Sequence, residues 1–228
     1  MKKILCLALI LFAYIAVSAQ EKTITQAEFD AVHKTSIDKW KGKSYRMVYS
    51  TQSNIEGRPE ASYSSKNIIE FASPTHSRSI SESTLNSKTT RTEDIRIGDK
   101  TYKRIGDGKW QEGVFQPYTP RIENKPPVAN QEESQIEYKY FGTEKLNNQT
   151  ANVYVVTKKV KGINSSNNKE YLHNIVNKYW FSQDGLILKL HMEMETRTLV
   201  VTARNNLIHT WELDPNIKIE APNLNEIK

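Results

Sequence analysis

The feature that most constrains the fold is a ten-residue stretch, residues 186–195, in which apolar and polar side chains alternate. The even positions are all apolar: Leu186, Leu188, Leu190, Met192 and Met194. The odd positions are polar, with Ile187 as the exception. Because successive side chains of a β-strand point to opposite faces, this alternation predicts a strand with one apolar and one solvated face. The sheet that contains it is therefore expected to have one dry side.

Turn signals separate further strands from Gly42 onwards, and Gly98-Asp99 and Asp184-Gly185 are two-residue hairpin turns. The predicted strands are Tyr45–Tyr49, Asn67–Phe71, Arg91–Ile97, Lys100–Ile105, Ile136–Lys145, Ala151–Lys161, Tyr171–Ser182, Leu186–Arg197, Leu199–Arg204 and Leu207–Leu213. The last two are expected to form a hairpin around Asn205-Asn206. Consecutive hairpins make an antiparallel meander of roughly ten or eleven strands, and so wide a sheet is expected to curl or close.

One helix is expected near the start of this region, over residues 25–41. Thr25 is a plausible N-cap with Glu28 three residues later, which is the pattern of a capping box. Apolar residues then recur at roughly helical spacing, and Gly42 suits the end of the helix. This helix is the expected cover for part of the dry face of the sheet.

The N-terminus has the pattern of a secretory signal peptide. Lys2 and Lys3 precede an apolar run, Ile4–Val17, and small residues lead up to a cleavage site near Ala19. Cleavage leaves a single expected domain, residues 20–228, which is periplasmic or secreted. Cys6 precedes most of the apolar run, so we expect it to be discarded with the signal peptide. The mature chain is then not a lipoprotein and contains no cysteine.

Charge and known motifs exclude several function classes. The net charge is +6, but the basic residues are scattered and form no run interleaved with aromatic residues, so nucleic-acid binding is not expected. The five histidines show no close metal-binding spacing. Neither a nucleophile elbow nor a glycine-rich phosphate loop is present. We therefore expect no catalytic residues, no metal and no cofactor.

A proline-rich stretch, residues 113–134, resists assignment to strands. It contains four prolines and few apolar residues. Loops of this length without secondary structure are uncommon in compact domains and are often functional flaps or linkers. The stretch is expected to be such a loop within one continuous sheet, although it could instead divide two small domains.

Several short segments, taken in order, resemble the bacterial lipoprotein-carrier superfamily, which includes LolA, the LppX-like lipid carriers and the sensor domain of RseB. These segments are Ile97–Tyr102, Asp107–Trp110, Phe141–Leu146, Asn152–Val156, Tyr179–Lys189 and Asp214–Pro222. The resemblance implies an incomplete β-barrel of about eleven strands, whose concave apolar face is covered by helices and holds acyl chains. It also implies lid helices in the middle of the chain, where this sequence has the proline-rich stretch.

Together these observations predict a mainly β protein, an antiparallel half-barrel with an N-terminal helix on its concave face, that carries a lipid or an acylated protein without being an enzyme. The candidate ligand-lining residues are Tyr45, Met47, Tyr138, Tyr140, Trp180, Leu188, Leu190, Met192 and Met194. A solidly filled core is the competing interpretation of the same residues. The alternative function is an envelope sensor or scaffold that binds a protein partner, and an enzyme or a carbohydrate-binding module on the same fold stays open.

Overall fold

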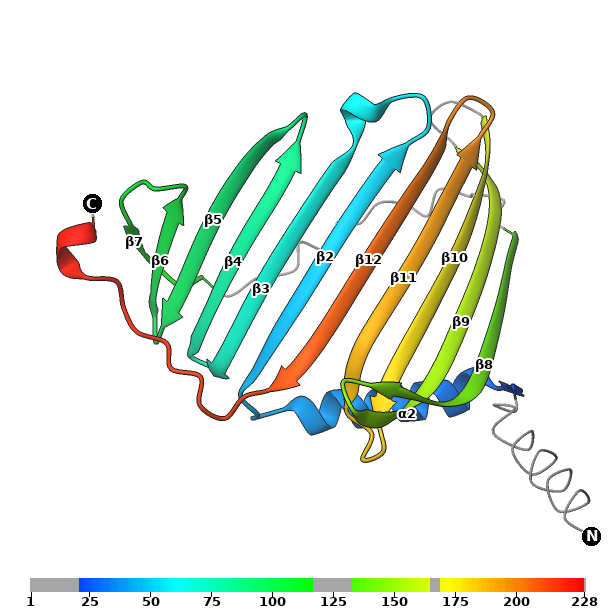
Figure 1. The fold of residues 1–228 in the computed structure, drawn as a ribbon, viewed down its shortest axis with the longest axis horizontal. Coiled ribbons are helices and arrows are strands. Elements are labelled where there is room, and N and C mark those ends of the chain that lie inside the picture. Colours follow the sequence, from blue (N-terminus) through cyan, green and yellow to red (C-terminus); the bar gives the residue numbers. More distant parts are fainter. Residues whose placement is uncertain (1–20, 117–132, 165–168, 228) are drawn as a thin grey trace, which may run out of the picture.

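Twelve antiparallel strands form one wide sheet in the computed structural model, which describes residues 21–116, 133–164 and 169–227 (Figure 1). The strands are β1 (Lys22–Ile24), β2 (Tyr45–Ile55), β3 (Tyr63–Ser73), β4 (His76–Leu85), β5 (Lys88–Ile97), β6 (Lys100–Ile105), β7 (Gln111–Val114), β8 (Glu133–Leu146), β9 (Gln149–Asn164), β10 (Lys169–Ser182), β11 (Ile187–Thr198) and β12 (Thr202–Leu213). One α-helix, α2 (Gln26–Trp40), and two short 3-10 helices, η1 (Pro59–Ala61) and η2 (Leu224–Glu226), complete the described elements.

Within the part of the chain that the structure describes, the sheet is a meander with β1 and β7 as its edge strands. Its spatial order is β1-β8-β9-β10-β11-β12-β2-β3-β4-β5-β6-β7, and the edge strands β1 and β7 do not pair with each other. The predicted fold class, a mainly β meander that stops short of a closed barrel and carries an N-terminal helix, is confirmed. The short edge strand β1 was missed because its three residues carry no turn or alternation signal.

The turn predicted at Asn205-Asn206 is wrong. β12 runs without a break through Asn205 and Asn206, which pair with Met194 and Glu193 of β11. The turn lies earlier, and the N–H of Thr198 donates to the carbonyl of Val201 to close it (2.9 Å). Ladder hydrogen bonds on both sides of β12 thus outweigh the turn preference of two asparagines.

The proline-rich stretch is shorter than predicted at both ends. Residues 113 and 114 belong to β7, and residues 133 and 134 belong to β8. The rest of that stretch, apart from residues 115 and 116, lies outside the described residues, as do the expected signal peptide and Cys6.

Helix α2 confirms the predicted capping box. The N–H of Glu28 donates to the Thr25 hydroxyl (3.2 Å), and the N–H of Thr25 donates to the Glu28 carboxylate (2.7 Å). The helix lies along one end of β8 to β11 (Figure 1). Phe29 packs there with Val156, Phe181 and Ile187 as one buried cluster. The side of the sheet that α2 covers is called the helix face below, and the other side is called the opposite face.

A β-bulge breaks the alternation from which the sequence analysis began. Phe181 pairs with Ile187, but the preceding residue, Trp180, pairs with Lys189, so Leu188 is an extra residue in β11. Ile187 therefore packs under the helix, whereas Leu188 packs against Trp180 on the opposite face. The prediction that Leu188 shares a face with Leu190 is wrong, and the bulge explains why Ile187 looked exceptional.

Candidate functional site

An apolar belt runs across the helix face beyond the end covered by α2. Directly paired residues of an antiparallel sheet share a face, so the strand register identifies its members. The belt consists of Met47, Tyr49, Ile175, Leu190, Met192, Met194 and Leu207. None of them packs against the Phe29 cluster, and all are half-buried. The belt is thus an apolar surface that the helix leaves partly open.

Four of the nine predicted lining residues lie in this belt: Met47, Leu190, Met192 and Met194. Three more share the helix face but pack elsewhere. Tyr138 contacts Phe29, with ring centroids 5.7 Å apart, Tyr140 contacts Tyr154 at 5.1 Å, and Tyr45 lies beside Trp40 at 5.2 Å. Sequence reasoning missed Ile175 and Leu207 as lining residues, because only the register between strands places them beside the methionines. Tyr49 was also left out of the predicted lining, although alternation along its own strand puts it on the same face as Met47.

Trp180 and Leu188, the other two predicted lining residues, belong to the core of the opposite face. They form a cluster with Ala151 and Val153, and Trp180 is 6% exposed. The Trp180 indole N–H donates to the carboxylate of Glu144 (2.9 Å). Trp180 and Leu188 therefore lie on the other side of the sheet from Leu190, Met192 and Met194, and they do not line the belt.

Methionine is concentrated in the belt. The sequence contains four methionines, and the three after Met1 are Met47, Met192 and Met194. Methionine is unbranched and polarizable, so it adapts to irregular or mobile apolar partners better than branched side chains do. A belt rich in methionine suits a flexible apolar ligand.

The helix face becomes hydroxyl-rich next to the belt, along β3 and β4. Ser79, Ser81 and Ser83 of β4 pair with Ile69, Asn67 and Ser65 of β3. Sequence analysis missed β4 altogether, because a strand of alternating serines has few β-branched residues and lacks the apolar period of a typical strand. The helix face therefore combines an apolar half with a polar half.

His209 lies inside the belt, between Leu190 and Tyr49 in the register. Its ring centroid is 5.1 Å from that of Tyr49 and 5.5 Å from that of Trp211. Burial lowers the pKa of His209 below its ordinary value, because the charged form loses solvation there. The belt thus favours a neutral imidazole.

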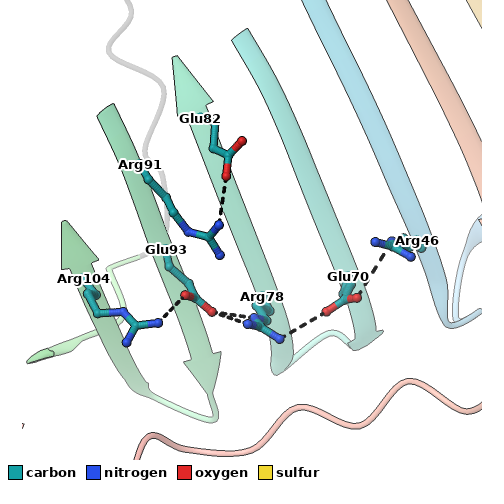
Figure 2. Close-up of polar contacts among 7 residues, drawn as sticks. All are labelled: Arg46, Glu70, Arg78, Glu82, Arg91, Glu93 and Arg104. Carbon is teal, nitrogen blue, oxygen red and sulfur yellow. Dashed lines mark hydrogen bonds and ion pairs between the residues drawn. The ribbon is translucent and has the colours of Figure 1, made fainter. Parts of the chain in front are cut away.

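A chain of ion pairs crosses the opposite face (Figure 2). Glu93, 2% exposed, accepts hydrogen bonds from Arg78 (2.7 Å) and Arg104 (2.8 Å), and Glu70 continues the chain towards Arg46. Burial alone would raise the pKa of Glu93, but the two guanidinium groups outweigh it and hold the pKa below its ordinary value. The network links neighbouring strands from β2 to β6 through side-chain contacts, and we interpret it as structural.

A pocket of about 660 Å³ lies at the strand ends near the end of α2, and residues from both faces of the sheet line it. Its lining mixes apolar residues such as Trp40 and Trp211 with charged ones such as Arg46, Asp184 and Glu212. This mixture differs from the continuous apolar lining expected around an acyl chain.

Among the described residues, no helix is long and apolar enough to cross a membrane, and no three histidine, cysteine or acidic residues are grouped as metal ligands. No family model matches the sequence. No curated protein sequence matches it either.

Solved structures with similar architecture do exist. LprF from Mycobacterium bovis is 11% identical with a TM-score of 0.45, and the alignment covers 86% of this chain and 98% of that one. A LolA superfamily protein from Nitrosomonas europaea is 11% identical with a TM-score of 0.29, over 85% of this chain and 94% of that one.

Proposed function

We propose that this protein binds the acyl chain of a lipid or of an acylated protein on its helix face, and acts as a non-enzymatic carrier in the periplasm or outside the cell. The observation that carries the proposal is the apolar belt, seven half-buried side chains beyond the helix. The signal-peptide pattern of residues 1–19 supports the extracytoplasmic location.

The belt has the size and chemistry for an acyl chain. It extends over four neighbouring strands, β10, β11, β12 and β2. Since adjacent strands lie about 4.8 Å apart, a ligand crossing them runs for about 14 Å over apolar side chains. Each methylene removed from water contributes about 0.8 kcal/mol, so even partial burial of such a chain gives useful affinity.

Detergent-free purification from a bacterial periplasm followed by native mass spectrometry tests this proposal. The wild-type protein is expected to carry an extractable adduct of lipid mass, or to acquire myristoyl lysophosphatidylcholine when that lipid is added. Met192→Asp is expected to abolish binding, because it places a charge in the middle of the belt.

The matched control is Val176→Asp, which changes a 37% exposed apolar residue on the opposite face of β10. It is expected to retain binding. A wild-type protein that stays bare after incubation with phospholipid and lipopeptide contradicts the carrier proposal. Equal loss in both folded variants contradicts the assignment to the belt.

The second candidate, an envelope sensor or scaffold that binds a protein partner, is favoured by the turn between β11 and β12. Leu199 and Val200 are adjacent there and are 78% and 71% exposed. Replacing both with serine is expected to abolish co-purification with an envelope protein if the turn is a contact site. An unchanged set of crosslinked partners would count against this second function.

A further inference from the structure

The charged residues of the sheet are distributed very unevenly between its two faces. In the described parts of β8 to β12 and of β2 to β4, the register places every glutamate on the opposite face: Glu70, Glu82, Glu133, Glu137, Glu144, Glu170, Glu193, Glu195 and Glu212. The helix face of these strands has no carboxylate. Apart from Lys145 and Lys169 at strand ends, its one Lys or Arg is Lys158.

Lys158 lies in apolar surroundings in the middle of β9. It pairs with Ile136 of β8 and Ile175 of β10, and Val156 and Val160, 9% and 6% exposed, flank it along its own strand. The lysine is half-buried, and no hydrogen bond or ion pair joins it to any other described residue. With no counter-ion among the described residues, this ammonium group is available to an anionic ligand on the helix face.

A second polar group without a partner lies diagonally across from it. Asn177 pairs with Val156 and Met192, one register step from the Lys158–Ile175 pair. Its side-chain oxygen is buried and accepts no hydrogen bond within the described structure. Diagonal neighbours on one face lie roughly 7–8 Å apart, a separation that a single head group can bridge. The lysine offers a cation and the asparagine an acceptor, so together they suit an anionic group that also carries a hydroxyl.

These two residues adjoin one end of the apolar belt, where Ile175 pairs with Met194 and Asn177 with Met192. We propose that the ligand is an anionic phospholipid or lysophospholipid, whose phosphate contacts Lys158 and whose head-group hydroxyl contacts Asn177. Its acyl chain then crosses β11 and β12 towards Met47. This inference rests on the proposed function and names the chemical class of its ligand.

The inference is tested by calorimetric titration with two lysolipids that share a myristoyl chain and differ in head-group charge. Wild-type protein is expected to bind anionic lysophosphatidylglycerol about tenfold more tightly than zwitterionic lysophosphatidylcholine, a difference of about 1.4 kcal/mol. Lys158→Met, which keeps the apolar stem, is expected to remove this preference without weakening lysophosphatidylcholine binding. Lys158→Arg keeps the positive charge and is expected to retain the preference for the anionic lipid.

The control is Lys159→Met, which removes the same charge from the next residue, an exposed one on the opposite face. It is expected to bind both lipids as the wild type does. Equal affinities for the two lipids in wild type, or an unchanged preference in Lys158→Met, would overturn the head-group assignment and leave acyl-chain binding intact. A wild type that binds neither lipid would overturn the proposed function itself.

A separate arm distinguishes the lipid from a soluble phosphate. Glycerol phosphate, which has the phosphate but no acyl chain, is expected not to displace lysophosphatidylglycerol at equal concentration. Displacement by glycerol phosphate would show that the site recognises a soluble phosphate ester and would overturn the assignment to a lipid.

Discussion

At the scale of single residues, Ser36 shows how one small polar side chain fixes the contact between helix and sheet. It is 1% exposed although serine is seldom found fully buried. Its hydroxyl accepts a hydrogen bond from the N–H of Ile187 (2.7 Å), at the bulge where the regular ladder is interrupted. The helix therefore meets the sheet at the place where a backbone donor needs a side-chain partner.

Ser36→Ala is expected to lower the free energy of unfolding by about 1–3 kcal/mol, because the buried N–H of Ile187 loses its acceptor. Urea denaturation followed by circular dichroism measures this change. Thr35→Ala, at an exposed position on the same helix, is the control and is expected to change stability by no more than about 0.5 kcal/mol. Equal effects of the two substitutions would contradict the role given to Ser36.

Glu93 makes stability depend on pH in a defined direction. Its pKa is lower in the folded protein than the reference value of 4.5, so the folded state holds the charged form more strongly than the unfolded state does. The resulting stabilisation is present above about pH 4.5 and is lost as the pH falls through the folded pKa. Glu93→Gln is expected to destabilise the protein at pH 7 by about 2 kcal/mol or more.

The same variant is expected to show a weaker decrease in stability between about pH 5 and pH 3 than the wild type. Urea denaturation at several pH values measures both curves. Glu82→Gln is the control, because Glu82 pairs with Arg91 at an exposed site. Parallel curves for wild type and Glu93→Gln would contradict this account.

At the scale of secondary-structure elements, local signals decided how much could be predicted from the sequence. The helix was predicted correctly because Thr25 and Glu28 specify its start through contacts three residues apart. The serine-rich strand β4 was missed, and the β12 turn was misplaced, because pairing with neighbouring strands determines both. The bulge at Leu188 is likewise a relation between two strands. Four of the seven belt residues were predicted from the sequence, whereas Ile175 and Leu207 are placed beside them by the register alone.

The cap of α2 gives a prediction at this scale. Thr25→Ala is expected to lower the free energy of unfolding by about 1 kcal/mol, since the first turn loses its side-chain acceptor. Thr25→Ser keeps the hydroxyl and is expected to stay within a few tenths of the wild type. Thermal or urea denaturation of the three proteins measures the difference, and equal stability of the alanine and serine variants would contradict the capping role.

At the scale of the whole molecule, the two faces of the sheet differ in the side chains that they carry. The opposite face carries the glutamates and the arginine network that braces β2 to β6 (Figure 2). The helix face carries the belt, the serines and Lys158. The ion-pair network and the proposed ligand surface thus lie on different faces, so substitutions in the belt are expected to leave the network intact.

Ligand binding is therefore expected to stabilise the whole sheet. A lipid present at about one hundred times its dissociation constant adds about 2.7 kcal/mol to the free energy of unfolding, if it binds the folded state alone. Urea denaturation with and without myristoyl lysophosphatidylglycerol measures this shift. Lys158→Met is expected to show a smaller shift at the same lipid concentration, whereas Lys159→Met is expected to match the wild type.

The strand order also has a consequence for how the chain folds. β2 to β7 and β8 to β12 are each built from neighbours in sequence, and β12 with β2 is the one junction between these two groups. Loop-closure entropy makes such a distant pairing slower than the formation of local hairpins. The belt straddles that junction, with Leu207 opposite Thr51 and Met47 opposite Trp211. The belt is therefore expected to be completed only when β12 pairs with β2, after the local hairpins have formed.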